Sequence, residues 1–169
     1  MTQVGGDLTT RMIGAAFLNI ETFEEVEHDE TATAQAAAIV VGVAVCKALG
    51  TWGGGLGFAL WSATVAFGSW LVWAGITYLV GEKIFQGKAT WGELLRTLGF
   101  AQAPGVLFIL GVVPVIGGLS SWVASLWIMI AGFIAIRQAL DIGNGKTFLT
   151  VLVGGGVYSF LQIFSFFPF

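Results

Sequence analysis

The chain has 169 residues, of which 56% are hydrophobic and 10% charged, and its formal net charge is −3. Soluble domains carry about 25% charged residues, so a mean hydropathy of +0.88 leaves too few polar groups to cover a soluble surface. Seven of the ten acidic residues, but only Arg11 among the basic ones, precede the first long apolar run. This distribution argues against nucleic-acid binding, a polybasic lipid anchor and an N-terminal signal peptide.

Two helices are expected from the N-terminal region, of which the first is short and the second can continue without interruption into the first apolar run. Residues 8–19 have the pattern of an amphipathic helix too weak to span a membrane. A second helix should begin near Thr22, whose hydroxyl can accept from the Glu25 amide while the Glu25 carboxylate reaches back, forming a capping box. The only histidine, His28, lies in the acidic cluster "EEVEHDE", which is typical of a solvated helix end more than of a fixed metal cage. We predict a cytoplasmic acidic region over residues 1–33 and a membrane domain over 34–169.

Five apolar runs follow, and a helix needs about 20 residues to cross the hydrocarbon. Backbone polar groups cannot stay unpaired in lipid, so helices are the expected form of these runs. The sequence therefore predicts an all-α, polytopic membrane helical bundle with five transmembrane helices. The third run is short and contains Pro114 and the Gly117–Gly118 pair. The expected spans are 34–49, 56–80, 104–119, 121–140 and 147–166.

Positive residues alternate between the loops. The first and third loops have none, whereas the second and fourth contain or adjoin Lys83, Lys88, Arg96, Arg137 and Lys146. The positive-inside rule then places the N-terminus in the cytoplasm and the C-terminus outside. Trp52 and the terminal "FSFFPF" are expected in the outer aromatic belt. Lys47 is the exception near the outer end of the first span, where it either snorkels to the interface or faces the bundle and binds a lipid phosphate or a substrate.

The segment "TWGELLRTLGF" has the pattern of an amphipathic helix. Thr90 and Glu93 form a capping box, and Trp91, Leu94, Leu95 and Leu98 share one apolar stripe. Such a helix lies in the interface plane with its stripe toward the acyl chains. We therefore expect an interfacial helix between spans two and three. The candidate residues for contact with lipid or a partner are Trp91, Leu94, Arg96, Leu98, Lys47 and Arg137.

The same region carries a family resemblance. "LVGEKIFQGKATWGELLRTLGFAQAP", followed by "PVIGG" and "AIRQAL…NGK", resembles the Yip family of integral membrane proteins (Ypt/Rab-interacting proteins). "NIETFEEV" is similar to the family's opening, with Ile20 where a proline is common. The resemblance implies five membrane helices, a cytoplasmic N-terminus and, in eukaryotes, a role in vesicle trafficking with Rab GTPases. The short N-terminal region here favours a prokaryotic member in the plasma membrane.

Catalytic chemistry has little support in the sequence. No Ser/His/Asp set can be assembled from one histidine outside the spans, Cys46 has no histidine or aspartate nearby, and "GNGKT" lacks the spacing of a phosphate-binding loop. Arg137 and Asp141 are spaced i, i+4, which favours a local ion pair. We predict no catalytic residue, no metal and no cofactor.

Two functions fit these observations. The first is a non-enzymatic integral membrane scaffold or interaction protein that contacts lipids and a membrane or cytoplasmic protein through the interfacial helix and the acidic N-terminal helices. Faces of small residues would also permit a homo-oligomer. The alternative is a small-molecule or lipid transporter, in which Lys47, Arg137 and the broken third span line a path.

Overall fold

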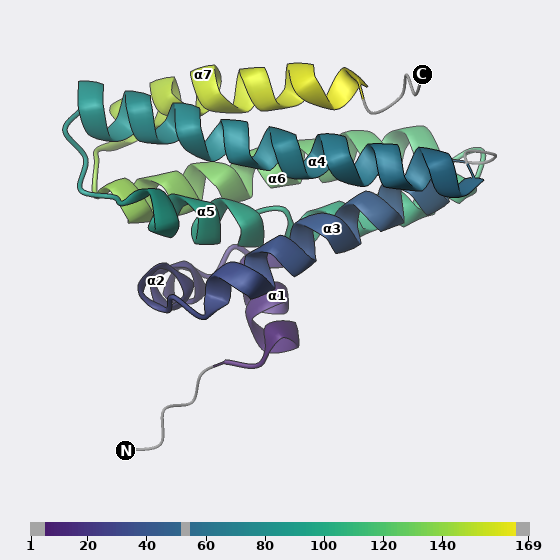
Figure 1. Cartoon of the computed structure of the whole chain (residues 1–169), viewed down its shortest axis with the longest axis horizontal. Coiled ribbons are helices and arrows are strands. Elements are labelled where there is room, and N and C mark those ends of the chain that lie inside the picture. Colours follow the sequence, from purple (N-terminus) through teal and green to yellow (C-terminus); the bar gives the residue numbers. More distant parts are fainter. Residues whose placement is uncertain (1–5, 52–54, 165–169) are drawn as a thin grey trace.

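A computed structural model describes residues 6–51 and 55–164, and every regular element within these ranges is helical (Figure 1). Five segments are long and apolar enough to cross a membrane, which confirms the predicted fold class and number of candidate spans. Trp52 and the residues after 164 lie outside the described ranges, and so does most of the expected outer aromatic belt. The five segments are Ala32–Gly50, Gly55–Ile84, Trp91–Val112, Gly117–Leu140 and Asn144–Ile163.

Four of these segments consist mainly of one long α-helix. They are α3 (Ala32–Gly50), α4 (Gly55–Tyr78), α6 (Gly117–Leu140) and α7 (Asn144–Ile163). The π-helix η1 (Leu79–Ile84) extends α4. Their apolar residues are distributed all round each helix, which is the pattern of a membrane span.

The third segment differs from the prediction. It begins at Trp91 and not at 104, because α5 (Trp91–Phe100) continues into the 3₁₀ helix η2 (Ala103–Val112). Pro104 stands in the first turn of η2, where its missing N–H costs nothing. The Gly117–Gly118 pair begins α6 and does not interrupt the third span. An interfacial position for α5 is therefore not confirmed.

The N-terminal helices α1 (Leu8–Ala16) and α2 (Ile20–His28) lie against the bundle beside α5 (Figure 1). The Asn19 side chain caps α2 by accepting from the Thr22 amide at 3.2 Å. The capping box expected at Thr22 is wrong, because the Glu25 carboxylate accepts from Arg11 instead. Phe23 of α2 is fully buried and joins the hydrophobic core of the membrane segments. The cytoplasmic location of this region stays a prediction.

The five membrane segments form a closed ring. Contacts join α3 to η2, η2 to α6, α6 to α7, α7 to α4 and α4 back to α3. Inside the ring, the buried Trp73 of α4 packs against Gly132 of α6 and Gly154 of α7, and a methyl group at Gly132 would lie 2.6 Å from its indole. These two glycines allow the close helix packing that small residues permit in membrane bundles. Gly42 and Gly68 face open space and do not serve that purpose.

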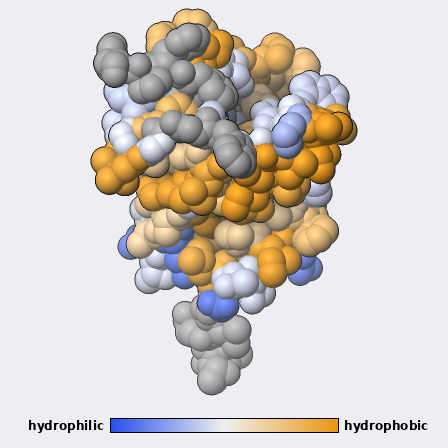
Figure 2. Space-filling model, turned by 90° about the vertical axis from the view of Figure 1, so that its right-hand side faces the viewer, coloured by the Kyte–Doolittle hydropathy of each residue, from blue (hydrophilic) through white to orange (hydrophobic). Residues whose placement is uncertain are grey.

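The outer surface of the bundle is apolar. Large hydrophobic side chains are exposed on several segments, among them Leu56, Leu119 and Phe160. On the face shown in Figure 2, hydrophobic residues form a broad band across the middle of the molecule, and the most hydrophilic residues lie mainly below it, toward the N-terminal helices. An apolar surface of this extent is the one that a bundle in hydrocarbon presents.

Candidate functional site

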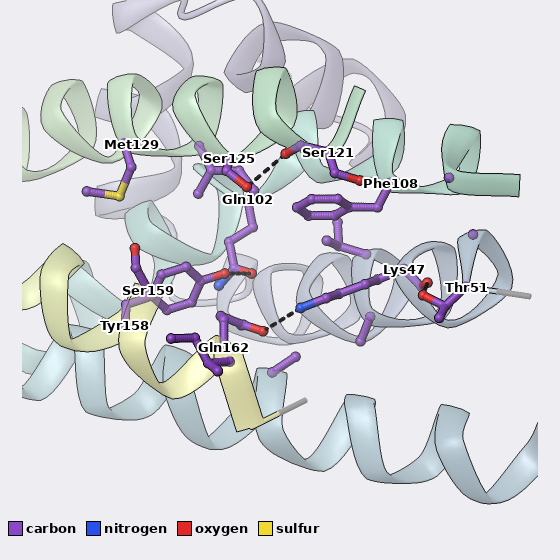
Figure 3. Close-up of a pocket in the computed structure, with 17 residues that line it drawn as sticks. Lys47, Thr51, Gln102, Phe108, Ser121, Ser125, Met129, Tyr158, Ser159 and Gln162 are labelled. Atoms are coloured by element: carbon purple, nitrogen blue, oxygen red, sulfur yellow. Dashed lines mark hydrogen bonds between the residues drawn. The ribbon is translucent and has the colours of Figure 1, made fainter. Parts of the chain in front are cut away.

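A cavity of about 290 Å³ lies inside the ring (Figure 3). All five membrane segments contribute to its wall, and most of its residues come from the ends of α3, η2 and α7 and from the first half of α6. It therefore occupies the end of the bundle away from α2. Its volume is at the low end for ligand pockets. The polar lining residues are Lys47, Thr51, Gln102, Ser121, Ser125, Tyr158, Ser159 and Gln162.

Lys47 points into this cavity. Val43, Ala44 and Lys47 all line it, as residues three and four apart on one helix face do. The Lys47 ammonium donates to Gln162 Oε1 at 3.2 Å and lies 5.9 Å from the centroid of the Phe108 ring. Of the two orientations that the sequence left open, the structure shows the one in which Lys47 faces the bundle.

Gln102 and Tyr158 form a second polar pair in the cavity wall. Gln102 lies at the break between α5 and η2, is 1% exposed, and accepts from the Tyr158 hydroxyl at 3.2 Å. Its other amide atom, Nε2, is buried and has no hydrogen-bond partner. Sequence reasoning did not identify this pair as part of a site. The available signal was the presence of polar side chains inside apolar spans.

The described lining of the cavity carries a positive charge and no negative charge. Its 17 described lining residues include Lys47 and no aspartate, glutamate, arginine or histidine. Elsewhere in the described part of the chain, no group of three His, Cys, Asp or Glu residues could hold a metal ion. His28 lies with its Nδ1 2.8 Å from the Glu24 carbonyl oxygen. The arrangement suits a small anionic or neutral polar group.

The predicted interfacial residues form a different structure. The Thr90–Glu93 capping box is confirmed, with Thr90 N donating to Glu93 Oε2 at 2.7 Å and Glu93 N to Thr90 Oγ1 at 3.3 Å. Leu94 and Leu98 are fully buried, so the expectation that they face acyl chains is wrong. The physical reason is that α2, α3, α4 and α6 surround α5. Only Trp91 is exposed, at 41%, with its ring edge-on to Tyr78.

Arg96 connects α5 to the end of α2. Its side chain is buried, and Nε donates to the carbonyl oxygens of Val26 at 3.0 Å and Glu27 at 3.1 Å. These carbonyls belong to the last turn of α2, where the helix itself supplies no donors. Arg96 thus acts as a C-terminal cap from a neighbouring helix and is not presented to a partner.

Arg137 lies outside the cavity. It is exposed near the end of α6, eight residues beyond Met129, or roughly 12 Å along the helix at 1.5 Å per residue. The ion pair expected with Asp141 is wrong: Asp141 bonds Lys88 at 3.1 Å. Asp141 has a left-handed backbone, with φ at 51°, and follows the last helical residue, so it does not continue the helix face of Arg137. The structure does not bring Lys47 and Arg137 together.

Arg11 forms a buried group of ion pairs and hydrogen bonds that the sequence did not predict. Its side chain is 2% exposed, and Nη2 lies 2.8 Å from Glu25 and 2.6 Å from Asp29. Nη1 donates to Gln35 of α3 at 3.0 Å. Hydrogen bonds from Thr31 and Arg11 hold the pKa of Asp29 below its usual value. Arg11 therefore fastens α1 to α2 and to the first membrane segment.

Comparison with protein-family models shows a relationship over most of the chain. The family model described as the Yip1 domain matches residues 13–166, which include α2 and all five membrane segments. No curated protein and no solved structure matches the chain.

Proposed function

The chain belongs to the Yip1 domain family, and on that premise we propose that it is a non-enzymatic membrane scaffold that binds a basic protein partner through its acidic N-terminal helices. Family membership and five apolar segments make it an integral membrane protein. The observation that carries the proposal is the attachment of α2 to the bundle. Arg11 and Arg96 hold this helix in place, so its acidic residues form a fixed surface.

The exposed acidic side chains of α2 and of the turn that follows it have the properties of a docking surface for a basic partner. Glu21, Glu24 and Glu30 are exposed, and the Glu24 carboxylate accepts from Gln138 of α6 at 3.0 Å. A surface of one sign favours a partner of the opposite sign and disfavours anionic lipid headgroups. Lys88, in the loop before α5, and Lys146, in the first turn of α7, lie on the side of the bundle where α6 ends and α7 begins. By the positive-inside rule, we place this end in the cytoplasm.

Site-specific photo-crosslinking tests this surface. A photoreactive amino acid at Glu21 in native membranes should give a discrete adduct with a basic cytoplasmic protein. Changing Glu24 and Glu30 to glutamine should reduce its yield roughly fivefold or more, since each exposed ion pair contributes up to about 1 kcal/mol. The same probe at Leu119, which is exposed on the far side of the molecule, serves as the control. Adducts with lipid alone, or a yield unaffected by the glutamine changes, would contradict the proposal.

The cavity favours transport as the second candidate function. A path for a solute needs polar groups inside the bundle, and Lys47, Gln102 and Gln162 supply them. Transport predicts flux of a small solute or lipid in proteoliposomes, reduced severalfold in Lys47→Ala. Absence of flux across a broad panel of anionic and neutral solutes, and of lipid scrambling, would eliminate this alternative.

A further inference from the structure

We propose that the cavity in the ring is a binding site for an anionic oxygen group, either the headgroup phosphate of a lipid with a net negative charge or a free phosphate ion. Lys47 supplies the charge and the Gln102 amide supplies a second donor. This inference concerns the end of the bundle away from α2 and does not depend on the scaffold function.

The first argument is the cost of a charged group inside a membrane protein. Hydrogen bonding between α3 and α7 would need only a neutral side chain at position 47, because Gln162 is itself neutral. An ammonium group costs much more to place among apolar helices than an amide does, and charged residues at such positions commonly mark a ligand or ion site. The Phe108 ring stabilises a cation but does not require one. A binding role accounts for a charged side chain at this position.

The second argument is the unpartnered amide of Gln102. Because the Tyr158 hydroxyl donates to Oε1, the amide is oriented with Nε2 as a donor. Gln102 lines the cavity, is 1% exposed, and Nε2 has no partner. A buried donor is normally satisfied, so one in a cavity wall indicates a missing acceptor. An oxygen of a bound anion would supply it.

The third argument is selectivity for anions. The described lining residues provide an ammonium, an amide and the hydroxyls of Ser121 and Ser159, and among them there is no carboxylate that would repel an anion. The hydroxyls of Thr51 and Ser125 donate to backbone carbonyls four residues earlier, and that of Tyr158 donates to Gln102. A volume of about 290 Å³ suits a compact group such as phosphate more than an extended solute. Because all five segments contribute to the wall, the bound group would also connect α3, η2, α6 and α7 at their ends.

Native mass spectrometry of the purified full chain tests the site. The protein in a neutral detergent is titrated separately with phosphatidylglycerol, with phosphatidylcholine and with inorganic phosphate. We expect one saturable adduct with phosphatidylglycerol or with phosphate, and the arm in which it forms identifies the source of the anion. Lys47→Gln should weaken that adduct roughly tenfold or more, as expected for loss of a charged hydrogen bond. Lys47→Arg should retain it.

Matched variants separate this site from general attraction to charge. Lys146→Gln removes the same charge from an exposed position in the first turn of α7 and should leave the adduct unchanged. Gln102→Leu keeps Lys47 and should weaken the adduct severalfold. This variant tests the site if Lys47→Gln does not elute as a single species during purification. Equal adducts with both lipids and none with phosphate, or equal losses in Lys47→Gln and Lys146→Gln, would overturn the proposal.

Discussion

Gly50→Ala is expected to lower the thermal unfolding temperature of the detergent-solubilised protein by roughly 5 to 10 °C. Gly50 is the last residue of α3, and a methyl group there would overlap the carbonyl oxygen of Phe108 in η2. This atom belongs to the backbone, so it can move only if α3 and η2 separate. Overpacking of this kind costs about 1 to 3 kcal/mol, and 1 kcal/mol corresponds to about 2 to 4 °C in a protein of this size.

Gly42→Ala is the matched control in the same helix. A methyl group at Gly42 meets nothing within 4 Å, and alanine is a better helix former than glycine by up to about 1 kcal/mol. This variant should be as stable as the wild type or slightly more stable. Intrinsic tryptophan fluorescence during heating provides the measurement for both proteins. Equal unfolding temperatures for the Gly50 and Gly42 variants would show that α3 and η2 are not in the close contact described.

Hydropathy predicted α4 and α6 well, because their apolar residues are continuous and their ends carry few polar groups. It failed for the third segment. The charges of Glu93 and Arg96 led to the prediction that this helix lies at the membrane interface. In the structure, Arg96 instead donates to backbone carbonyls about 70 residues earlier in the chain. A hydrogen bond between a charged side chain and a distant backbone segment cannot be recognised from the residues next to that side chain in the sequence. The correct segment could be recognised only once α2 was known to pack on α5.

The cavity was partly predictable. Lys47 stood out as a charge in an apolar run, but its orientation depends on Gln162, which lies 115 residues further along the chain. The place of Gln102 in the site also depends on contact between helices that are distant in the sequence, because its partner Tyr158 belongs to α7, the last helix. Sequence spacing gives no information about such pairs. Single polar residues in apolar runs therefore identified candidates for the site and could not assemble it.

The structure of the N-terminal region was also only partly predictable from the sequence. The sequence pattern predicted two N-terminal helices, but the second ends at His28 and does not continue into the first membrane segment. The acidic composition gave no sign that Arg11, one cation among many carboxylates, has a structural role. The guanidinium is almost fully buried and contacts residues 14 to 24 positions away. Composition therefore predicted that this surface is acidic. The contacts that hold it against the bundle could be identified only from the structure.

Arg11→Met should release α1 and α2 from the bundle. The change leaves Glu25 and Asp29 without their shared cation, and these carboxylates are 43% and 26% exposed. Loss of one partner of a buried pair costs about 3 to 5 kcal/mol, and the exposure of the carboxylates reduces this to about 2 kcal/mol. Amide hydrogen exchange in residues 8–28 should accelerate roughly thirtyfold. Lys83→Met, which breaks an exposed ion pair with Glu82, is the control and should leave this exchange unchanged.

The dependence of this attachment on pH gives a second measurement. The pKa of Asp29 is lowered in the folded protein, by Thr31 first and then by Arg11, from an ordinary value of 3.8. A lowered pKa means that the ionised carboxylate stabilises the fold above about pH 4 and that this stabilisation is lost as the pH falls through the folded value. After correction for intrinsic exchange rates, protection of residues 8–28 in the wild type should decrease on acidification below about pH 4. In Arg11→Met that decrease should be smaller, because one of the two causes of the shift is gone. An equal acid response in both proteins would mean that Arg11 does not hold Asp29 in the folded state.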